Sequence, residues 1–234
     1  MSTTLNIAFL SDTHRRHLNI RVPPCDILVF CGDATSSRGA TGLQELDNFL
    51  RWMVREAKGA KCVMIFGNHD WVGTTYLSEC RILCERHGVT LLHDSGATVE
   101  GVSFWGSPRT PEFCGWAFMY SPDEAPGVWE SIPENTDVIV THGPPFGILD
   151  TTEFGVHVGC PELCLRVHHI APAIHAFGHI HEGRGVRMGY WTCFVNAAVV
   201  DRYAHEFYEP TVITLEDSTG KWRPLFSIAS PDEV

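Results

Sequence analysis

The stretch LNIAFLSDTH, residues 5–14, decides the fold of this chain, because an apolar run leads directly into an Asp-x-His pair. Its first six residues read as a buried strand. The same arrangement, an apolar run followed by a short polar block, occurs four more times. Those blocks are Gly32-Asp33, Gly67-Asn68-His69-Asp70, Thr141-His142-Gly143 and Gly178-His179-Ile180-His181. Open α/β sheets place ligand sites at the carboxyl ends of their strands, so we expect the five blocks to meet there.

The segments between the blocks alternate between helical and strand patterns. Apolar spacing predicts helices over residues 41–57 and 74–87, and Pro161 predicts the first turn of another that runs to His169. Residues 90–105 predict antiparallel strands joined by tight turns, and 106–136 an irregular excursion with one short helix. Strand patterns resume at Val138 and again from Trp191. Helix-linked and hairpin-linked strands together predict an α/β fold of two mixed sheets packed together, with helices outside.

The composition restricts the class of protein. The chain has 234 residues, 44% of them hydrophobic, and we expect one domain over residues 1–234. Its formal net charge of -11 argues against a broad basic face for long nucleic acid. No apolar stretch approaches the roughly 18 residues that span a bilayer, so no membrane partner is expected. Nine cysteines, an odd number, and no basic or apolar leader predict a reducing, cytoplasmic location. The oligomeric state stays open.

The polar blocks contain seven side chains with metal-binding chemistry. These are Asp12, His14, Asp33, Asn68, His142, His179 and His181. Asp12 and His14, two residues apart on an extended segment, would point to the same side and bind one cation. His179 and His181 share this spacing, but a loop could aim them at two different cations.

Asp33 is the natural bridge between two cations, because a carboxylate has two oxygens. A mixture of oxygen and imidazole ligands suits Mn, Fe or Zn better than Ca or Mg, with Mn favoured in vitro. The sequence therefore predicts two divalent metal ions as cofactors.

Two cations about 3.5–4 Å apart can generate hydroxide near neutral pH and orient and stabilise a phosphoryl group. In the third block, Asn68 would be a ligand, while His69 is free to face the substrate. Asp70 could accept the other N–H of the His69 ring and favour its protonated form. A protonated His69 would then stabilise or protonate the leaving oxygen.

Each block has a plainer interpretation when taken alone, as a polar turn or a helix cap. Five such blocks, each at a strand end, favour the metal site. Arg109, in the irregular excursion, is the best candidate for substrate contact. Several aromatic residues of that region could stack a base, although burial is the default for most of them: Phe104, Trp105, Phe113, Trp116 and Phe118.

A second group of possible metal ligands lies around the helix at Pro161. Cys160, Cys164 and His168 are spaced four residues apart, and this spacing could mimic a zinc site. Small apolar packing by the two cysteines is the expected outcome.

The complete set of blocks resembles the calcineurin-like metallophosphoesterases, whose pattern is Asp-x-His, Gly-Asp, Gly-Asn-His-Asp/Glu, a lone His and Gly-His-x-His. It is most similar to the metallophosphoesterase-domain-containing branch of animals, related to class III cyclic nucleotide phosphodiesterases. The similar stretches span about residues 5 to 200. The resemblance implies a four-layer α/β/β/α sandwich of two mixed β-sheets flanked by helices.

The resemblance also implies which residues hold each cation. Asp12, His14, Asp33 and His181 would hold one cation, and Asp33, Asn68, His142 and His179 the other. His69 would face the substrate. Some members of the branch carry Gly in place of His179, which weakens the second metal site. This chain retains the histidine, so we expect a competent two-metal enzyme.

The expected function is a metal-dependent phosphodiesterase that hydrolyses small phosphodiesters, with cyclic nucleotides as the favoured class, by in-line attack of a hydroxide bridging the cations. Its partner would be a small-molecule phosphoester, possibly a nucleotide. One alternative is a phosphomonoesterase or protein phosphatase that uses the same site. Another is a nucleotide-binding regulator with vestigial activity.

Overall fold

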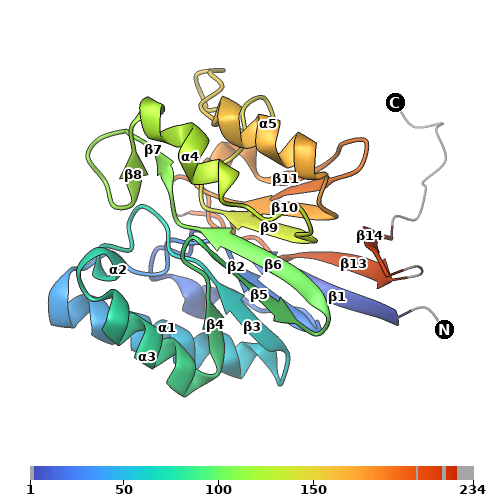
Figure 1. Cartoon of the computed structure of the whole chain (residues 1–234). Coiled ribbons are helices and arrows are strands. Elements are labelled where there is room, and N and C mark those ends of the chain that lie inside the picture. The colour runs from blue at the N-terminus through green and yellow to red at the C-terminus, as the bar shows by residue number, and fades with distance from the viewer. Residues whose placement is uncertain (1–2, 204, 218–219, 226–234) are drawn as a thin grey trace.

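Alternating apolar residues bury both faces of the first strand, β1 (Thr3–Leu10). Ile7 and Phe9 pack between two sheets, whereas Ala8 and Leu10 pack toward helices on the outer side of the first sheet. Successive side chains of a strand point to opposite faces, so a strand that is apolar at every position needs cover on both sides. The computed structural model, which describes residues 3–203, 205–217 and 220–225, provides that cover (Figure 1).

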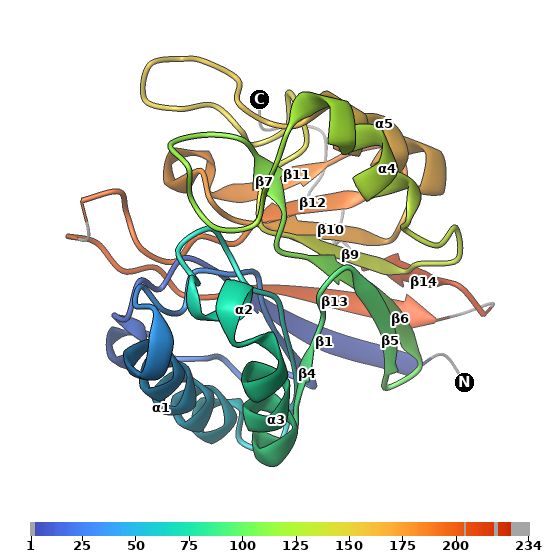
Figure 2. The same ribbon diagram turned by 60° about the vertical axis from the view of Figure 1, so that its left-hand side comes forward.

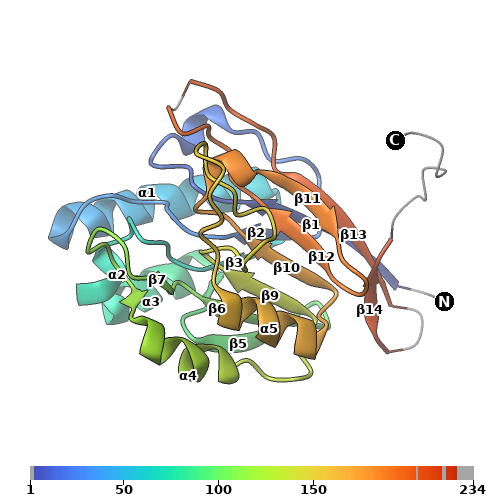
Figure 3. The ribbon, with the colours of Figure 1, turned by 90° about the horizontal axis from the view of Figure 1, so that it is seen from above.

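The first sheet has the strand order β14-β13-β1-β2-β3-β4. Its four parallel strands are β1, β2 (Ile27–Phe30), β3 (Lys61–Met64) and β4 (Val89–Leu91). Two antiparallel strands from the end of the chain, β13 (Thr211–Asp217) and β14 (Trp222–Pro224), complete it beside β1, as Figure 3 shows. The helices of this half are α1 (Gly39–Ala57), α2 (Val72–Thr75) and α3 (Leu77–His87).

The second sheet has the order β11-β12-β10-β9-β6-β5. Four strands run parallel: β6 (Val102–Ser107), β9 (Val138–Thr141), β10 (Ile174–Phe177) and β12 (Cys193–Asn196). The edge strands β5 (Ser95–Val99) and β11 (Gly185–Met188) pair antiparallel to their neighbours. The helices of this half are α4 (Ala125–Glu130) and α5 (Pro161–Ile170). Short elements fill the connections: β7 (Thr110–Pro111), β8 (Met119–Tyr120), and 3-10 turns at His17–Asn19, Pro122–Glu124 and His181–Gly183.

Three apolar clusters hold the layers together. One lies between the two sheets, and the other two lie between each sheet and its own helices. In Figure 2, α1 and α3 cover the first sheet, and α4 and α5 cover the second. The predicted four-layer α/β/β/α sandwich of two mixed sheets is confirmed.

The structure corrects three local predictions. The helix predicted over 41–57 begins two residues earlier, at Gly39, and the helix predicted over 74–87 is divided at Tyr76 into α2 and α3. Residues 95–107 form the expected hairpin, but Val89–Leu91 pairs with β3 in parallel. The reason is that α3 returns the chain along the first sheet, and Gly88, with φ of 71°, ends that helix and leads into β4.

Candidate metal centre

The five polar blocks meet at the carboxyl ends of parallel strands from both sheets. β1, β2 and β3 supply the first three blocks, and β9 and β10 supply the last two. Backbone hydrogen bonds tie the blocks to one another: the Asp12 N–H donates to the Gly32 carbonyl at 2.9 Å, and the Gly178 N–H donates to the His142 carbonyl at 3.0 Å. The predicted site therefore spans the seam between the two sheets.

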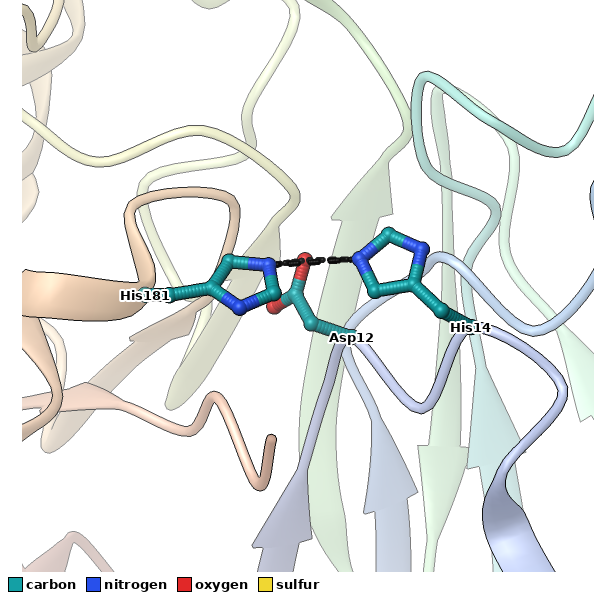
Figure 4. A group of neighbouring side chains, drawn as sticks. All are labelled: Asp12, His14 and His181. Carbon is teal, nitrogen blue, oxygen red and sulfur yellow. Dashed lines mark hydrogen bonds and ion pairs between the residues drawn. The ribbon is translucent and has the colours of Figure 1, made fainter. Parts of the chain in front are cut away.

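Asp12 lies between two histidines that come from opposite halves of the molecule (Figure 4). Its Oδ1 is 3.9 Å from His14 Nε2 and 3.6 Å from His181 Nε2. Its Oδ2 accepts a hydrogen bond from the His179 N–H at 3.0 Å. Oδ1 is buried and has no hydrogen-bond partner among the described residues. A buried carboxylate oxygen without such a partner is costly unless a cation faces it.

Asp33 connects this group to a second one. Its Oδ1 accepts a hydrogen bond from the His69 N–H at 2.8 Å, which fixes the carboxylate. Its Oδ2 lies 3.8 Å from His14 Nε2 and 3.5 Å from His142 Nε2. One oxygen of Asp33 thus faces ligands of both groups.

His142 is positioned by partners from the first sheet. Its Nδ1 is 2.8 Å from the Cys31 carbonyl, and its Nε2 is 2.7 Å from Asn68 Oδ1. A ring whose Nδ1–H donates to a carbonyl directs Nε2 toward the site. The His179 ring is close by, with its centroid 5.1 Å from that of His142. His142, Asn68 and His179 therefore gather on the side of Asp33 where the second cation is predicted.

Four of the seven predicted ligand residues have left-handed backbone conformations. The φ angles are 58° at Asp12, 42° at His14, 68° at Asp33 and 69° at His179. This conformation is uncommon outside glycine and is typical of strained functional sites. The expectation of an extended Asp12–His14 segment is wrong, because two left-handed residues aim both side chains at the same point.

Two glycines make room for the carboxylates. A Cβ at Gly178 would lie 2.1 Å from Asp12 Oδ2, and a Cβ at Gly67 would lie 2.3 Å from Asp33 Oδ1. No side chain fits at either position without displacing a predicted ligand. The glycines of the Gly-His-x-His and Gly-Asn-His-Asp blocks are therefore part of the site.

The electrostatics of the site favour positive charge. Burial would raise the pKa of Asp33, but His142 and His14 lower it to about 2. Burial would lower the pKa of His142, but the Asp33 carboxylate raises it to about 9. Burial would likewise lower the pKa of His181, but the neighbouring Asp12 carboxylate raises it to about 9. Ionised carboxylates that hold protons on neighbouring imidazoles would equally attract a metal cation.

The residues of the site differ in burial, and this divides the site into a buried floor and a partly exposed rim. Asp12, Asp33, Asn68 and His142 are buried and form the floor. His14, His69, His179 and His181 are partly exposed and form the rim. The donors are carboxylate, amide and imidazole groups without thiolate. Their carboxylate and imidazole atoms form three overlapping clusters, each within 4.8 Å: Asp12, His14 and His181; His14, Asp33 and His69; and Asp12, Asp33 and His142. Together with the unpartnered Asp12 Oδ1, this donor set fits divalent metal ions.

Asp70 has a different role from the predicted one. Its carboxylate is fully buried and accepts hydrogen bonds from the backbone N–H groups of Asp33, Thr35 and Gly67 at 2.7–2.8 Å. The Thr35 hydroxyl also donates to it at 2.8 Å. The prediction that Asp70 accepts from the His69 ring is wrong, because both carboxylate oxygens fix the loop that carries Asp33.

The His69 ring lies at the rim, as expected of a substrate-facing group. Its centroid is 5.1 Å from that of His14 and 5.1 Å from that of Trp116. Trp116 is a neighbour that the sequence did not single out from the other aromatics. No local pattern separates it from Trp105, which is buried.

Arg109 lies apart from the predicted ligands. Its Nε is 2.9 Å from Asp94 Oδ2, and Asp94 Oδ1 accepts the Ser107 hydroxyl at 2.7 Å. The hollow beside Arg109 is lined by Asp94, Asp123 and Glu124, and by no predicted metal ligand. The guanidinium is thus held by a carboxylate outside the metal centre.

The cysteines near α5 pack as expected. Cys160 is buried, and its Sγ accepts the N–H of Leu163 as the helix cap. His168 Nδ1 is 2.7 Å from the Cys164 carbonyl, one turn earlier on α5. These residues form no part of a convergent ligand cluster within the described chain. No helix of the described residues has the length and apolarity needed to cross a bilayer.

Comparisons with known proteins agree with this geometry. The family model of the calcineurin-like phosphoesterases matches residues 5–183. Metallophosphoesterase domain-containing protein 1 of Homo sapiens is 33% identical over 230 residues, covering 88% of this chain and 69% of the human protein. A UPF0046 protein of Caenorhabditis elegans is 35% identical over 213 residues, covering 83% of this chain and 69% of its own.

A solved structure supports the fold. The phosphopantetheinyl hydrolase of Mycobacterium tuberculosis superposes with a TM-score of 0.58 at 15% identity, covering 98% of each chain. Phosphoester hydrolysis at a divalent metal centre is the chemistry of the matching family. The family model, the relatives and the four-layer sandwich all lead to the same assignment. The chain belongs to the calcineurin-like phosphoesterase family.

Proposed function

We propose that this protein is a phosphodiesterase that uses two divalent cations to hydrolyse small phosphodiesters. The observation that carries the proposal is the position of Asp33 Oδ2, which lies within 3.8 Å of His14 Nε2 and 3.5 Å of His142 Nε2. A single carboxylate oxygen that faces two groups of ligands is suited to bridge two metal ions.

The two groups divide around Asp33. Asp12, His14 and His181 would hold one cation with Asp33, and Asn68, His142 and His179 would hold the other. His179 and His181 belong to one block, yet the His181 Nε2 faces Asp12 while the His179 ring lies against His142. This arrangement supports a division of the pair between two cations. Mn is the metal to test first, with Fe and Zn as alternatives.

The bound cations would supply activated water near neutral pH and offset the charge that develops on the phosphoryl group. The protein orients the ester and moves a proton. The rim position of His69, 5.1 Å from His14 between ring centroids, places an imidazole beside the region where the phosphoryl group would bind. A protonated His69 would donate to the leaving oxygen as the ester bond breaks.

The preference for diesters rests on charge. Three arginines of the loops are paired with carboxylates: Arg15 with Glu45, Arg109 with Asp94, and Arg202 with Glu153. A phosphomonoester dianion carries one more negative charge than a diester, and these three paired guanidinium groups are not free to offset it. Cyclic nucleotides are the favoured substrates within the diester class.

The test is hydrolysis of a diester with Mn present, comparing the wild type with His69→Ala. We expect a loss of roughly 10²- to 10⁴-fold in kcat, with a larger loss for a poor leaving group than for p-nitrophenol. Equal metal content in the two proteins is the control. An equal fold loss in kcat for both leaving groups, or no loss at all, would contradict the role of His69.

Two other outcomes would identify other functions. Faster turnover of p-nitrophenyl phosphate than of its diester would indicate a phosphomonoesterase or protein phosphatase. Tight nucleotide binding without turnover would indicate a regulator with vestigial activity.

The remaining parts of the proposal concern the context of the enzyme. We propose a single catalytic domain over residues 1–234, acting in a reducing compartment such as the cytoplasm. Burial raises the pKa of most of the thiols, to about 12 at Cys62, Cys80 and Cys193, which disfavours their oxidation.

A further inference from the structure

The five aromatic residues that could contact a substrate ring differ in their exposure to solvent. Phe104 and Trp105 are buried in the apolar clusters. Phe118 stacks on Phe66, with ring centroids 5.9 Å apart and an interplanar angle of 3°. Trp116 and Phe113 remain, and both lie toward solvent: Trp116 is partly exposed and Phe113 is 61% exposed.

Trp116 contacts the two histidines that frame one side of the metal centre. Its ring centroid is 5.1 Å from that of His69 and 6.1 Å from that of His179. Phe113 packs against Trp116 at 5.5 Å, in an edge-to-face arrangement. The two rings thus extend the rim of the site outward from His69 into solvent.

The loop that carries these rings is fixed to the floor of the site. The Ala117 N–H donates to the Asn68 carbonyl at 3.1 Å, and Ala117 itself is buried. Left-handed φ angles at Cys114, Gly115 and Phe118 shape the loop. The Phe118 ring anchors it on Phe66. Trp116 is therefore presented to the site by a constrained segment, which limits the conformational entropy lost when a ligand binds.

The side of the centre next to His181 is polar, unlike the aromatic side next to His69. A hollow of about 540 Å³ beside His181 is lined by charged and phenolic side chains, among them Glu182, Arg202 and Tyr203. Arg202 pairs with both Glu153 and Glu182 there. A substrate whose phosphoryl group binds between the two sides would meet apolar ring faces next to His69 and a polar wall next to His181.

We propose that Trp116, supported by Phe113, is a stacking platform for a flat ring on the ester group nearest His69, such as a nucleobase or an aryl group. This inference rests on the proposed function, because it assumes that a phosphoryl group binds at the metal centre. Aromatic stacking favours flat rings over saturated ones of the same size. Trp116 is then a specificity-determining residue, which sets which phosphoesters bind rather than how fast the bond breaks.

The test compares phenylphosphonate with cyclohexylphosphonate, two phosphonates of similar size that cannot be hydrolysed. Their dissociation constants are measured by calorimetry on the Mn-loaded protein. We expect the wild type to bind phenylphosphonate roughly 5- to 100-fold more tightly, the range for stacking on one aromatic side chain. Trp116→Ala should lose this preference, and Trp116→Phe should keep most of it.

Trp191→Ala is the matched control, because Trp191 is a 57% exposed tryptophan that contacts Tyr190 and Arg223 rather than the metal centre. The control should keep the wild-type preference. Equal binding of the two phosphonates by the wild type, or an unchanged preference in Trp116→Ala, would overturn the platform. The binding measurement does not depend on turnover, so a ring preference in a protein without diesterase activity would refute the proposed function alone.

Discussion

Single residues of the metal centre are held by backbone groups, and this determines which of their atoms are available. Asp12 Oδ2 and Asp33 Oδ1 each accept a backbone N–H, from His179 and His69 respectively. The remaining oxygen of each carboxylate faces histidine nitrogens. Substituting one of these carboxylates therefore removes a ligand and also releases a neighbouring block.

Asp33 and His179 should differ in their effect on metal content. Asp33→Ala removes the proposed bridge, so we expect both ions and all measurable activity to be lost. His179→Gly removes a ligand from one group only and should mainly weaken one ion. Metal analysis after dialysis against limiting Mn measures both. Wild-type metal content in Asp33→Ala would refute the bridging assignment.

Asp70 should act on the stability of the fold. Asp70→Asn replaces one acceptor oxygen with a donor amide opposite N–H groups of Gly67 and the 33–35 loop. We expect the free energy of unfolding to fall by about 1–3 kcal/mol, the cost of an unsatisfied buried polar group. Urea denaturation of the metal-free protein measures it. His69→Ala, at the partly exposed rim, is the control and should unfold close to the wild-type midpoint.

Sequence patterns predicted which polar blocks come together but not their backbone geometry. The seven predicted ligands and His69 do come together, because each follows a strand whose apolar pattern is clear. The left-handed conformation at Asp12 and the partners of Asp70 could not be predicted, because both depend on contacts between blocks that are distant in sequence. The pairing of Arg109 with Asp94 could not be predicted either, because the β5–β6 hairpin brings these two residues together.

At the level of elements, strand ends and their glycines set the spacing of the site. Gly178 follows β10, and Gly127 lies inside α4. Gly178→Ala would place a Cβ 2.1 Å from Asp12 Oδ2, whereas nothing lies within 4 Å of a Cβ at Gly127. We expect Gly178→Ala to lose metal binding and about 1–3 kcal/mol of stability through overpacking.

Gly127→Ala is the matched control for this substitution. It should stabilise the protein by about 0.4–1 kcal/mol, because alanine reduces the freedom of the unfolded chain. Thermal unfolding and metal analysis of the two variants give the comparison. Full metal binding in Gly178→Ala would show that the block tolerates a side chain there.

The connections were harder to predict than the strands. β4 has only three residues, Val89, Thr90 and Leu91, and so short a pattern is equally compatible with a hairpin strand and a parallel strand. Its pairing with β3 depends on the path of α3, which no local pattern records. The β5–β6 hairpin was predicted correctly, because Glu100 and Gly101 with φ of 50° and 80° form the tight turn that their sequence favours.

At the scale of the whole molecule, a buried histidine should make stability depend on pH. His175 lies on β10, fully buried, with its Nε2 2.9 Å from the Thr141 hydroxyl. Burial lowers its pKa to about 3. The unfolded chain binds this proton near pH 6.5 and the folded chain does not, so stability is lost as pH falls from about 6.5 toward 3.

His175→Gln removes this titration. We expect the extra loss in the wild type to steepen as pH falls below 6.5, toward a limit of about 1.4 kcal/mol per pH unit. Urea denaturation in EDTA at pH 7, 6 and 5 measures the difference while keeping metal ions out. Parallel pH profiles for the two proteins would show that His175 does not carry the effect.

The proposed ligands of the metal centre come from residues 12 to 181, and the strands that position them belong to both sheets. During synthesis, the chain emerges with Asp12, His14 and Asp33 long before His142, His179 and His181 exist. A nascent chain thus holds three of the four residues of one proposed coordination sphere, and two of the four residues of the other, until most of the second sheet has left the ribosome. Loading with metal is then a late event, and it marks chains in which both halves have already docked.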